Sequence, residues 1–247
     1  MKLDVVMSPG ELTPGDVQGR VVAVIDVLRA TTSIAVALAN GAKAVIPVED
    51  VDEAMTRAKQ FERSQVKTAG ERKMLPIPGF DLGNSPAEFS PETVGGCTVV
   101  ITTTNGTRAL MALQGARDIV VAAYVNHAAV SAMLRAASRS NDILIVCAGT
   151  EGHFSLEDAA CAGRYVRSIM QGNASIMVND AAHACALIDG RYGDNISEIF
   201  KDSSHGSALA AAGFGDDLVA CARVDSHPVV PVYQDRQITR IGPDRAR

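Results

Sequence analysis

The chain has 247 residues, of which 47% are hydrophobic, and its formal net charge is −5. This length is sufficient for a large buried core, arranged as one large domain or two small ones. Acidic and basic residues are interspersed, so the sequence lacks the basic stripe of a nucleic-acid-binding protein, and no uncharged apolar run approaches the ~20 residues of a membrane span.

The cysteines and the N-terminus indicate a reducing compartment. Five cysteines are widely spaced, lie mostly among Ala, Val and Ile, and form no C-x-x-C pair. This pattern is typical of small buried thiols. Residues 1–4 do not lead from a basic region into a long apolar stretch. We therefore predict a cytoplasmic protein with neither a nucleic-acid nor a membrane partner.

The first half of the chain alternates strands and helices. Residues 21–26 form an apolar run that ends in a charge, as expected for a strand covered on both faces. The following elements are an Ala-rich helix at 32–39 that stops at Asn40-Gly41, a strand at 44–48, a helix at 50–63 and a strand at 66–69. This βαβαβ order is typical of a parallel sheet.

A long irregular segment at residues 70–93 interrupts the alternation. It is rich in Gly, Pro, Asn and Ser, and Phe80 and Leu82 argue against disorder. Loops of this length in a compact domain are usually functional or disordered. We predict that it forms a wall or lid of the functional site.

The second half resumes the alternation. The predicted elements are strand 97–101, helix 107–113, strand 118–122, helix 127–138, strand 142–146 and helix 156–170, then short helices that include 181–188, 195–200 and 207–212, a strand at 228–232 and a charged tail at 238–247. No linker divides the chain. We predict a single α/β domain over residues 1–247, with a layered, mostly parallel sheet flanked by helices and a helical C-terminal portion.

Three predicted strands deliver hydroxyls, amides or charge directly after they end, in segments 26–32, 102–107 and 147–152. In open α/β sheets, ligands bind in the crevice outside the carboxyl ends of the strands, where helix N-termini favour anions. Glycines beside Thr or Asn let backbone N–H groups turn toward one point. Thr and Asn are also ordinary helix caps, the better explanation for any one segment alone. Three segments together favour one shared site for a phosphate or sulfonate.

Charged residues follow two of the strands. Asp26 can hold a metal or attack an electrophile, and Arg29 can clamp an oxyanion; the alternative is a helix cap beside a surface arginine. Glu71 and Arg72 open the long segment directly after a strand, so they reach the same crevice unless they form a solvated ion pair.

Acids at the start of a later helix are further candidates. Glu157 and Asp158 suit the helix dipole, but they can also bind Mg²⁺, which is commonly held by one or two carboxylates with waters and substrate phosphate. Spacing alone does not choose the ligands among these two, Asp26, Glu71 and Asp81.

Several known signatures are absent. The five histidines have neither H-x-x-x-H nor H-E-x-x-H spacing, so no zinc site is expected; His153 and His205 are open to acid–base or substrate roles or are ordinary histidines. Asp26 lacks the second Asp of the haloacid-dehalogenase pair, Cys147 lacks the arginine of a cysteine phosphatase, and no P-loop is present. Any phosphoryl chemistry must use another arrangement.

A series of motifs nevertheless runs in order along the chain. These are Asp26-Val27-Leu28-Arg29-Ala30-Thr31-Thr32, Asn40-Gly41-Ala42, Gly70-Glu71-Arg72, Gly79-Phe80-Asp81-Leu82-Gly83-Asn84-Ser85-Pro86, Thr102-Thr103-Thr104-Asn105-Gly106-Thr107, Cys147-Ala148-Gly149, Leu156-Glu157-Asp158 and Asn179-Asp180. Together they resemble the 2-phosphosulfolactate phosphatase (ComB) family. The series covers roughly residues 20 to 232, so it is more specific than any single motif.

The resemblance implies a ComB-like fold and a Mg²⁺-dependent phosphatase that hydrolyses (2R)-2-phospho-3-sulfolactate to 3-sulfolactate and phosphate, a step in coenzyme M biosynthesis. On this interpretation the catalytic residues are Asp26, Arg29, Glu71 and Arg72. The substrate-binding residues are Thr31, Asn84, Ser85, Thr103, Thr104, Asn105, Gly106, Thr107 and Arg108. The Mg²⁺ ligands come from Asp26, Glu71, Glu157 and Asp158.

Two mechanisms and several functions stay open at this point. The phosphoryl group is attacked by Asp26, through an aspartyl-phosphate, or by a metal-activated water. The alternatives to the named activity are a phosphatase for a related small organic phosphate, a sugar-phosphate isomerase or transferase, and a non-catalytic sensor of organic phosphate. The partner is a small-molecule phosphate ester, and the Ala-rich helices are compatible with a homodimer. Every version requires the chain around residues 26, 72, 105 and 158 to meet at one pocket.

Overall fold

The computed structural model describes the whole chain except residues 14, 172–174 and 242–247. Within the described residues, eleven strands form one sheet in the order β5-β4-β6-β3-β11-β10-β7-β2-β8-β1-β9. The strands are β1 Lys2–Val6, β2 Val21–Ile25, β3 Ala44–Pro47, β4 Val66–Arg72, β5 Leu75–Pro76, β6 Thr98–Thr102, β7 Asp118–Ala122, β8 Ile143–Cys147, β9 Met177–Val178, β10 Pro231–Gln234 and β11 Gln237–Arg240. The α-helices are α1 Ala30–Ala39, α2 Val51–Ala58, α3 Pro91–Val94, α4 Gly106–Met111, α5 His127–Ala137, α6 Leu156–Met170, α7 Asp180–Tyr192, α8 Ile196–Asp202, α9 Ser204–Ala211 and α10 Gly215–Cys221.

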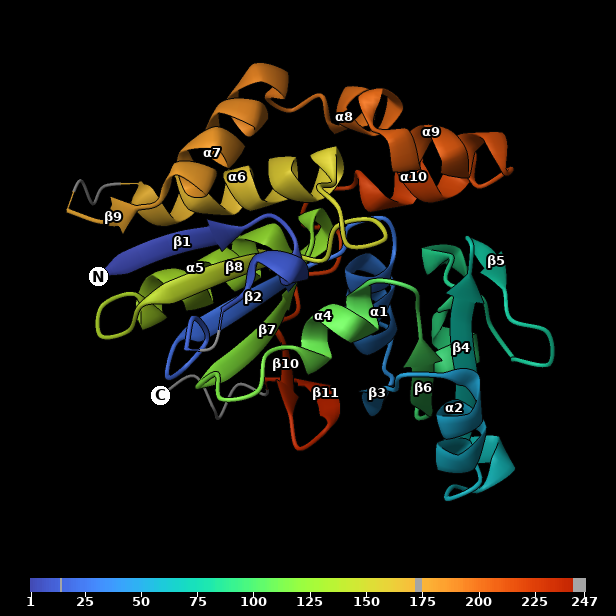
Figure 1. Ribbon diagram of the computed structural model, residues 1–247. Coiled ribbons are helices and arrows are strands. Elements are labelled where there is room, and N and C mark those ends of the chain that lie inside the picture. Colours follow the sequence, from blue (N-terminus) through green and yellow to red (C-terminus); the bar gives the residue numbers. More distant parts are fainter. Residues whose placement is uncertain (14, 172–174, 242–247) are drawn as a thin grey trace.

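The sheet consists of two parallel groups joined by an antiparallel hairpin (Figure 1). One group contains β4, β6 and β3, and the other contains β7, β2, β8, β1 and β9. The β10–β11 hairpin lies between them and pairs antiparallel with β7 on one side and with β3 on the other. The predicted α/β class with a mostly parallel sheet is confirmed.

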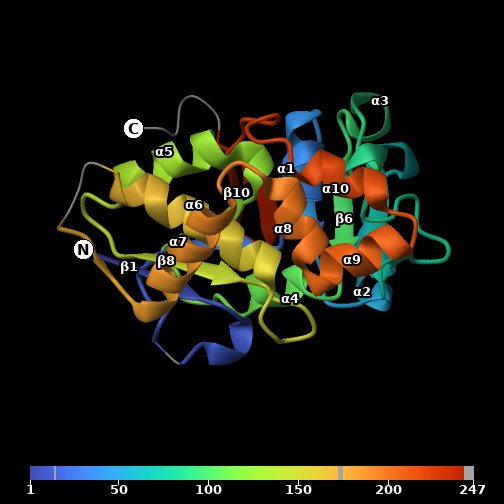
Figure 2. The ribbon, with the colours of Figure 1, turned by 90° about the horizontal axis from the view of Figure 1, so that it is seen from above.

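Helices cover both faces of the sheet, because successive residues of a strand point to opposite sides. In β2, Ala23 and Ile25 belong to the core cluster that includes residues of α5 to α9, whereas Val22 and Val24 belong to the cluster that includes α1 and α4. All five residues of β2 are buried, as its continuous apolar sequence predicts. From α7, the helices α8, α9 and α10 extend across to the side of the molecule that holds β4 and β6 (Figures 1 and 2).

The structure corrects the prediction at several points. The segment 238–247 is not merely a charged tail, because Gln237–Arg240 form β11; Ile238 is fully buried and pairs with Val45. The N-terminal strand β1 was not predicted, although it pairs with β8 over four residues. The irregular segment 70–93 contains part of β4, the short strand β5 and α3.

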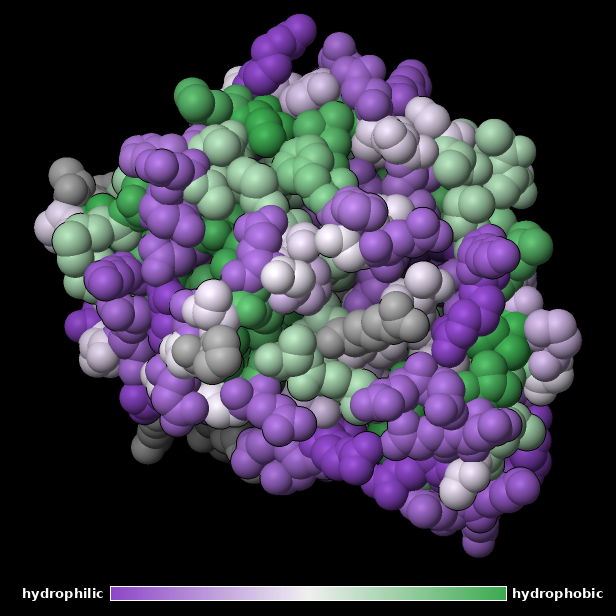
Figure 3. Space-filling model, in the orientation of Figure 1, coloured by the Kyte–Doolittle hydropathy of each residue, from purple (hydrophilic) through white to green (hydrophobic). Residues whose placement is uncertain are grey.

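The surface seen in Figure 3 is largely hydrophilic around α2, at the lower right. Exposed acids and bases alternate there, as in Asp52, Lys59 and Glu62. None of the helices in the described ranges is long and apolar enough to cross a bilayer. The division into domains stays a prediction.

Candidate active site

A cavity of about 390 Å³ lies beyond the carboxyl ends of β2, β4 and β6. Five parts of the chain line it: Asp26, Leu28 and Arg29 after β2; Glu71, Lys73, Met74 and Asn84 from the 70–93 segment; Thr103, Thr104 and Asn105 after β6; Thr150 and Glu151 after β8; and Ser204, His205 and Ala208 of α9. Of the four stretches that the sequence analysis requires to meet, those around residues 26, 72 and 105 line this cavity, whereas the stretch around residue 158 does not. Both parallel groups of strands contribute their carboxyl ends to one crevice.

Asp26 follows β2 and is only 5% exposed. The Thr31 hydroxyl accepts a hydrogen bond from the Asp26 N–H (3.0 Å) and donates to its carbonyl oxygen (2.8 Å), which fixes the turn into α1. One carboxylate oxygen accepts from the Ala30 N–H at 3.4 Å. The other lies so close to Gly106 that a Cβ on this residue would be 2.8 Å away. Glycine at position 106 therefore lets the turn after β6 approach the carboxylate.

The pKa of Asp26 is higher than that of an ordinary aspartate. Burial raises it to about 6; His205 and the Ala30 N–H oppose the rise, and the nearby carboxylates Glu71 and Glu157 add to it. Burial and like charge both disfavour the ionised form of a carboxyl group. A raised pKa in a residue that lines a cavity is typical of a functional group.

Asp158 joins the two neighbouring strand ends behind the cavity. Its carboxylate accepts hydrogen bonds from the Val27 N–H (2.9 Å) and the Gly149 N–H (3.1 Å), one on each oxygen. Burial and the charges of Asp26 and Glu157 raise the pKa of Asp158 well above its usual value. Asp158 and Glu157 are both buried but do not line the cavity. Asp158 is therefore an anchor for β2 and β8, and metal ligation by these two residues stays a prediction.

Glu71 lines the cavity and connects two of its walls. Its carboxylate accepts from the Met74 N–H (2.9 Å) and from the Thr104 N–H (2.7 Å). The neighbouring Arg72 is not a lining residue; its guanidinium donates to the carbonyl oxygen of Glu71 (2.8 Å) and to the Thr102 hydroxyl (2.9 Å). Arg72 therefore braces the ends of β4 and β6, and its catalytic role stays a prediction.

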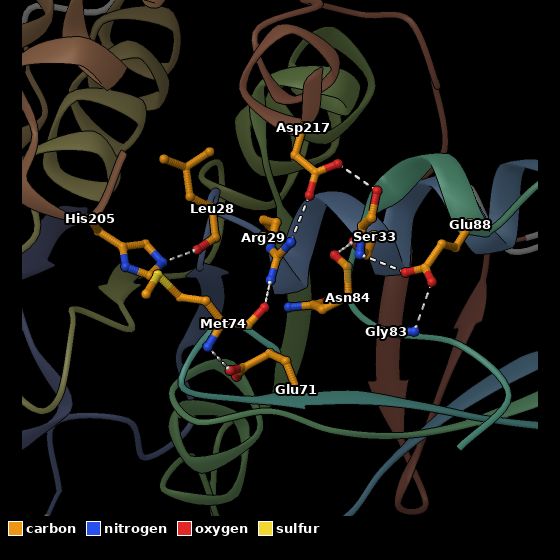
Figure 4. Close-up of polar contacts among 11 residues, drawn as sticks. Leu28, Arg29, Ser33, Glu71, Met74, Gly83, Asn84, Glu88, His205 and Asp217 are labelled. Atoms are coloured by element: carbon orange, nitrogen blue, oxygen red, sulfur yellow. Dashed lines mark hydrogen bonds and ion pairs between the residues drawn. The ribbon is translucent and has the colours of Figure 1, made fainter. Parts of the chain in front are cut away.

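Arg29 is held in place by three partners, of which Figure 4 shows Asp217 and Met74. It forms a buried ion pair with Asp217 of α10 (2.6 Å), donates to the Met74 carbonyl oxygen (2.7 Å) and lies 4.4 Å from the centre of the Phe214 ring. The Ser85 hydroxyl donates to the same Asp217 carboxylate. The charge of Arg29 is therefore matched by Asp217, and Ser85 contributes by orienting this acid rather than by lining the cavity.

Asn84 is placed by the turn that contains it. The Ser33 hydroxyl donates to the Asn84 carbonyl oxygen (2.8 Å), and Glu88 accepts from the N–H groups of Gly83 and Ser85, both at 3.1 Å (Figure 4). The side chain of Asn84 is 4% exposed, and its Oδ1 has no hydrogen-bond partner among the described residues. A buried polar atom that borders a cavity and has no protein partner is suited to bind a ligand or a water molecule.

The turn after β6 supplies a second polar wall. The Thr107 hydroxyl donates to the Thr103 carbonyl oxygen (2.9 Å), so Thr107 shapes the turn and does not line the cavity. Asn105 accepts from the Glu151 N–H (3.0 Å), which ties this turn to the loop after β8. The Thr104 hydroxyl is buried and has no partner among the described residues. The side chain of Arg108 lies outside the described part of the structure.

Several lining residues were not among the predicted site residues, and His205 and Lys73 are two of them that carry ionisable side chains. His205 of α9 points into the site, and its Nε2 lies 2.9 Å from the Leu28 carbonyl oxygen; because a carbonyl only accepts, Nε2 carries the proton (Figure 4). Lys73 lies directly after the Glu71-Arg72 pair. The sequence offered a weak signal for each: His205 precedes a glycine, and Lys73 lies in a run of polar residues. No local pattern, however, indicated that α9 would pack over the sheet.

The donor set of the cavity fits a hard divalent cation. Three carboxylates line it, those of Asp26, Glu71 and Glu151. Two cations also line it: Arg29, whose charge is paired with Asp217, and Lys73. In the described ranges, no three His, Cys, Asp or Glu side chains are grouped so as to hold a metal. Mg²⁺ does not need such a group, because it is commonly held by one or two carboxylates with waters and substrate phosphate. All-oxygen donors suit Mg²⁺ rather than a soft metal.

Comparisons with known proteins agree on one family. The profile of the family described as 2-phosphosulpholactate phosphatase matches residues 6–236. A protein of Symbiobacterium thermophilum named probable 2-phosphosulfolactate phosphatase is 39% identical over 223 residues, which is 90% of this chain and 95% of the relative. Proteins with the same name are 40% identical over 182 residues in Clostridium acetobutylicum (74% and 76% of the two chains) and 51% identical over 149 residues in Caldanaerobacter subterraneus (60% and 61%).

Proposed function

Since the chain belongs to the 2-phosphosulpholactate phosphatase family, we propose that it is a Mg²⁺-dependent phosphatase. The substrate is (2R)-2-phospho-3-sulfolactate, and the products are 3-sulfolactate and inorganic phosphate, as in coenzyme M biosynthesis. We propose a cytoplasmic location, which fits five buried cysteines without disulfides. The homodimer stays a prediction.

The observation that carries the proposal is the buried carboxylate of Asp26 at the floor of a cavity with hydrogen-bonding walls. The carboxylate faces the turn formed by Thr103, Thr104 and Asn105, which offers hydroxyl and amide groups to a phosphoryl group. Two buried polar atoms that lack a partner in the described part of the chain, on Asn84 and Thr104, are suited to bind a ligand. This combination fits a small polar ligand better than an apolar one.

The charge of the cavity supports the cation. A substrate with phosphate, sulfonate and carboxylate groups is repelled by three lining carboxylates, whereas a divalent ion at Asp26 offsets that repulsion. Asp26 would hold the ion, with Glu71 beside it in the cavity and Glu157 contributing charge from behind. When bound, Mg²⁺ polarises the phosphoryl group and neutralises charge on its oxygens.

The residues of the chain position the ester and supply the nucleophile or the general base. The backbone after β6 is fixed by the bond from the Thr104 N–H to Glu71, so its hydroxyls meet the phosphoryl oxygens without rearrangement. Asp26, largely ionised above pH 6, either attacks phosphorus and forms an aspartyl-phosphate that water hydrolyses, or accepts the proton of the attacking water. In both cases the ester P–O bond breaks, and the sulfolactate oxygen leaves and takes up a proton from water. His205, with its Nε2 proton directed to the Leu28 carbonyl, stands beside the same carboxylate.

A phosphate-release assay tests the proposal. Wild-type protein is incubated with 2-phosphosulfolactate, 2-phospholactate and sugar phosphates, each with Mg²⁺ and with a chelator. We expect release from phosphosulfolactate that requires the metal. Consumption of a sugar phosphate without phosphate release would identify an isomerase or transferase, and ligand-dependent melting shifts without hydrolysis would identify a sensor.

Rapid quench with phosphate-labelled substrate distinguishes the two roles of Asp26. A labelled wild-type protein and an unlabelled Asp26→Asn variant support the aspartyl-phosphate. Absence of label from a wild-type protein that turns over assigns Asp26 to proton transfer. Label that persists in Asp26→Asn excludes this residue as the nucleophile.

A further inference from the structure

The β4–β5 hairpin that borders the cavity has an unfavourable turn. Arg72 pairs with Leu75, so Lys73 and Met74 form a two-residue loop, and their φ angles are 50° and 71°. Two positive φ angles define a type I′ turn, for which Asn-Gly or Asp-Gly is strongly preferred. Neither lysine nor methionine favours this conformation. Backbone strain of this kind persists where the surroundings over-determine it, and it often marks function.

The site itself holds this turn in position. The Met74 N–H donates to Glu71 at 2.9 Å, and the Met74 carbonyl oxygen accepts from Arg29 at 2.7 Å (Figure 4). Arg29 is in turn paired with Asp217. The backbone of the turn is therefore clamped by two residues of the cavity wall, and both residues of the turn are among those that line the cavity.

Lys73 carries a positive charge that no acidic side chain in the described part of the chain balances. No ion pair or hydrogen bond of its side chain occurs within the described residues, whereas the other lining cation with a permanent charge, Arg29, is matched by Asp217. The nearest acid in sequence, Glu71, is occupied by the N–H groups of Met74 and Thr104. An unpaired cation on the wall of a cavity points to an anionic group of the ligand at this wall.

We infer that Lys73 recognises the sulfonate of the substrate and thereby determines specificity for sulfonated phosphate esters. This inference rests on the proposed phosphatase activity. The phosphoryl group is assigned to Asp26 and the turn after β6, so a second acid group on the same three-carbon skeleton lies at another wall of the cavity. A sulfonate is a singly charged group of three oxygens, which an exposed ammonium can pair with from any direction. The strained turn is retained because it carries this ammonium.

Substitution of Lys73 by Asn tests the inference, since Asn relieves the turn and removes the charge. The measurements are kcat/KM for 2-phosphosulfolactate and for 2-phospholactate, which lacks the sulfonate, together with the Tm. In Lys73→Asn the ratio of the two kcat/KM values should fall about tenfold, equivalent to ~1.4 kcal/mol, while the Tm stays level or rises by about 1–3 °C. Lys73→Arg should keep most of the ratio. The matched control is Lys59→Asn, at an exposed lysine after α2.

A binding measurement separates this inference from the proposed activity. Calorimetry compares 3-sulfolactate with lactate in wild type and Lys73→Asn, and it needs no turnover. Tighter binding of sulfolactate that depends on Lys73 supports the inference even if no ester is hydrolysed. A kcat/KM ratio unchanged within twofold in Lys73→Asn, or a wild type that binds both acids equally, would overturn it. Failure of phosphate release alone would overturn only the proposed activity.

Discussion

Replacement of Asp26 by Asn should inactivate the protein and at the same time stabilise its metal-free fold. The carboxylate is buried and lies near the charges of Glu71 and Glu157, which together raise its pKa from 3.8 to about 6. A tenfold change in proton affinity corresponds to about 1.4 kcal/mol, so ionised Asp26 costs the folded state ~3 kcal/mol. Asn keeps an acceptor oxygen for the long bond from Ala30 and carries no charge.

The sign of the pH dependence follows from proton binding. An unfolded aspartate releases its proton near pH 4 and the folded one near pH 6, so between these values the folded state binds more protons. Stability of the wild type therefore decreases as pH rises through this window. The Asn variant lacks this loss. The two proteins should have similar unfolding free energies near pH 4, and the variant should be more stable by about 1–3 kcal/mol above pH 6.

Urea unfolding in the presence of a chelator, at a series of pH values, measures this difference. Mg²⁺ should then stabilise the wild type but not Asp26→Asn, because a ligand stabilises only the state that binds it. Phosphate release by the variant should fall on the order of 10³-fold or more. A variant less stable than wild type above pH 6, or a difference independent of pH, would show that the Asp26 charge does not destabilise the folded state.

Asp158 provides a matched contrast in the same acidic cluster. Both of its oxygens accept backbone N–H groups, from Val27 and Gly149. Asn at this position has one acceptor oxygen, so one buried N–H loses its partner. Asp158→Asn should therefore destabilise the fold by about 1–3 kcal/mol, opposite in sign to Asp26→Asn. Equal effects of the two substitutions would show that net charge alone decides stability here.

The other predictions concern close packing, a buried ion pair and the metal. Gly106→Ala places a Cβ 2.8 Å from the Asp26 carboxylate and should reduce kcat/KM about 10²-fold. The control is Gly190→Ala, which should leave activity unchanged because a Cβ there meets nothing within 4 Å. Equal activity of the two variants would contradict the close packing of Gly106 against Asp26. Asp217→Ala leaves Arg29 buried without its partner and should lower the unfolding free energy by about 3–5 kcal/mol in urea titrations; a loss below about 1 kcal/mol would mean that the guanidinium finds water. A chelator should abolish phosphate release and added Mg²⁺ should restore it; undiminished release in the chelator would remove the cation from the proposal.

Much of the fold follows from local sequence signals. Helix 156–170 was predicted at the bounds it has, and in the structure the Ser155 side chain caps its start by accepting from the Asp158 N–H. The strand predicted at 21–26 is β2, since a continuous apolar run suits a strand buried on both faces. The position of Asp26 at the end of that strand, and hence in the crevice, needed no tertiary information.

Local signals specify the alternation of elements, the class of sheet and the strand ends at which polar residues gather, because caps, turns and hydrophobic periods act within a few residues. Which of these polar groups meet depends instead on how the elements pack. This packing turned Arg72 toward Thr102 and away from the cavity, and it brought His205 of α9 beside Asp26. It also presented Lys73 on a turn held by distant side chains. Such contacts depend on the packing of elements far apart in the chain, which no local pattern encodes.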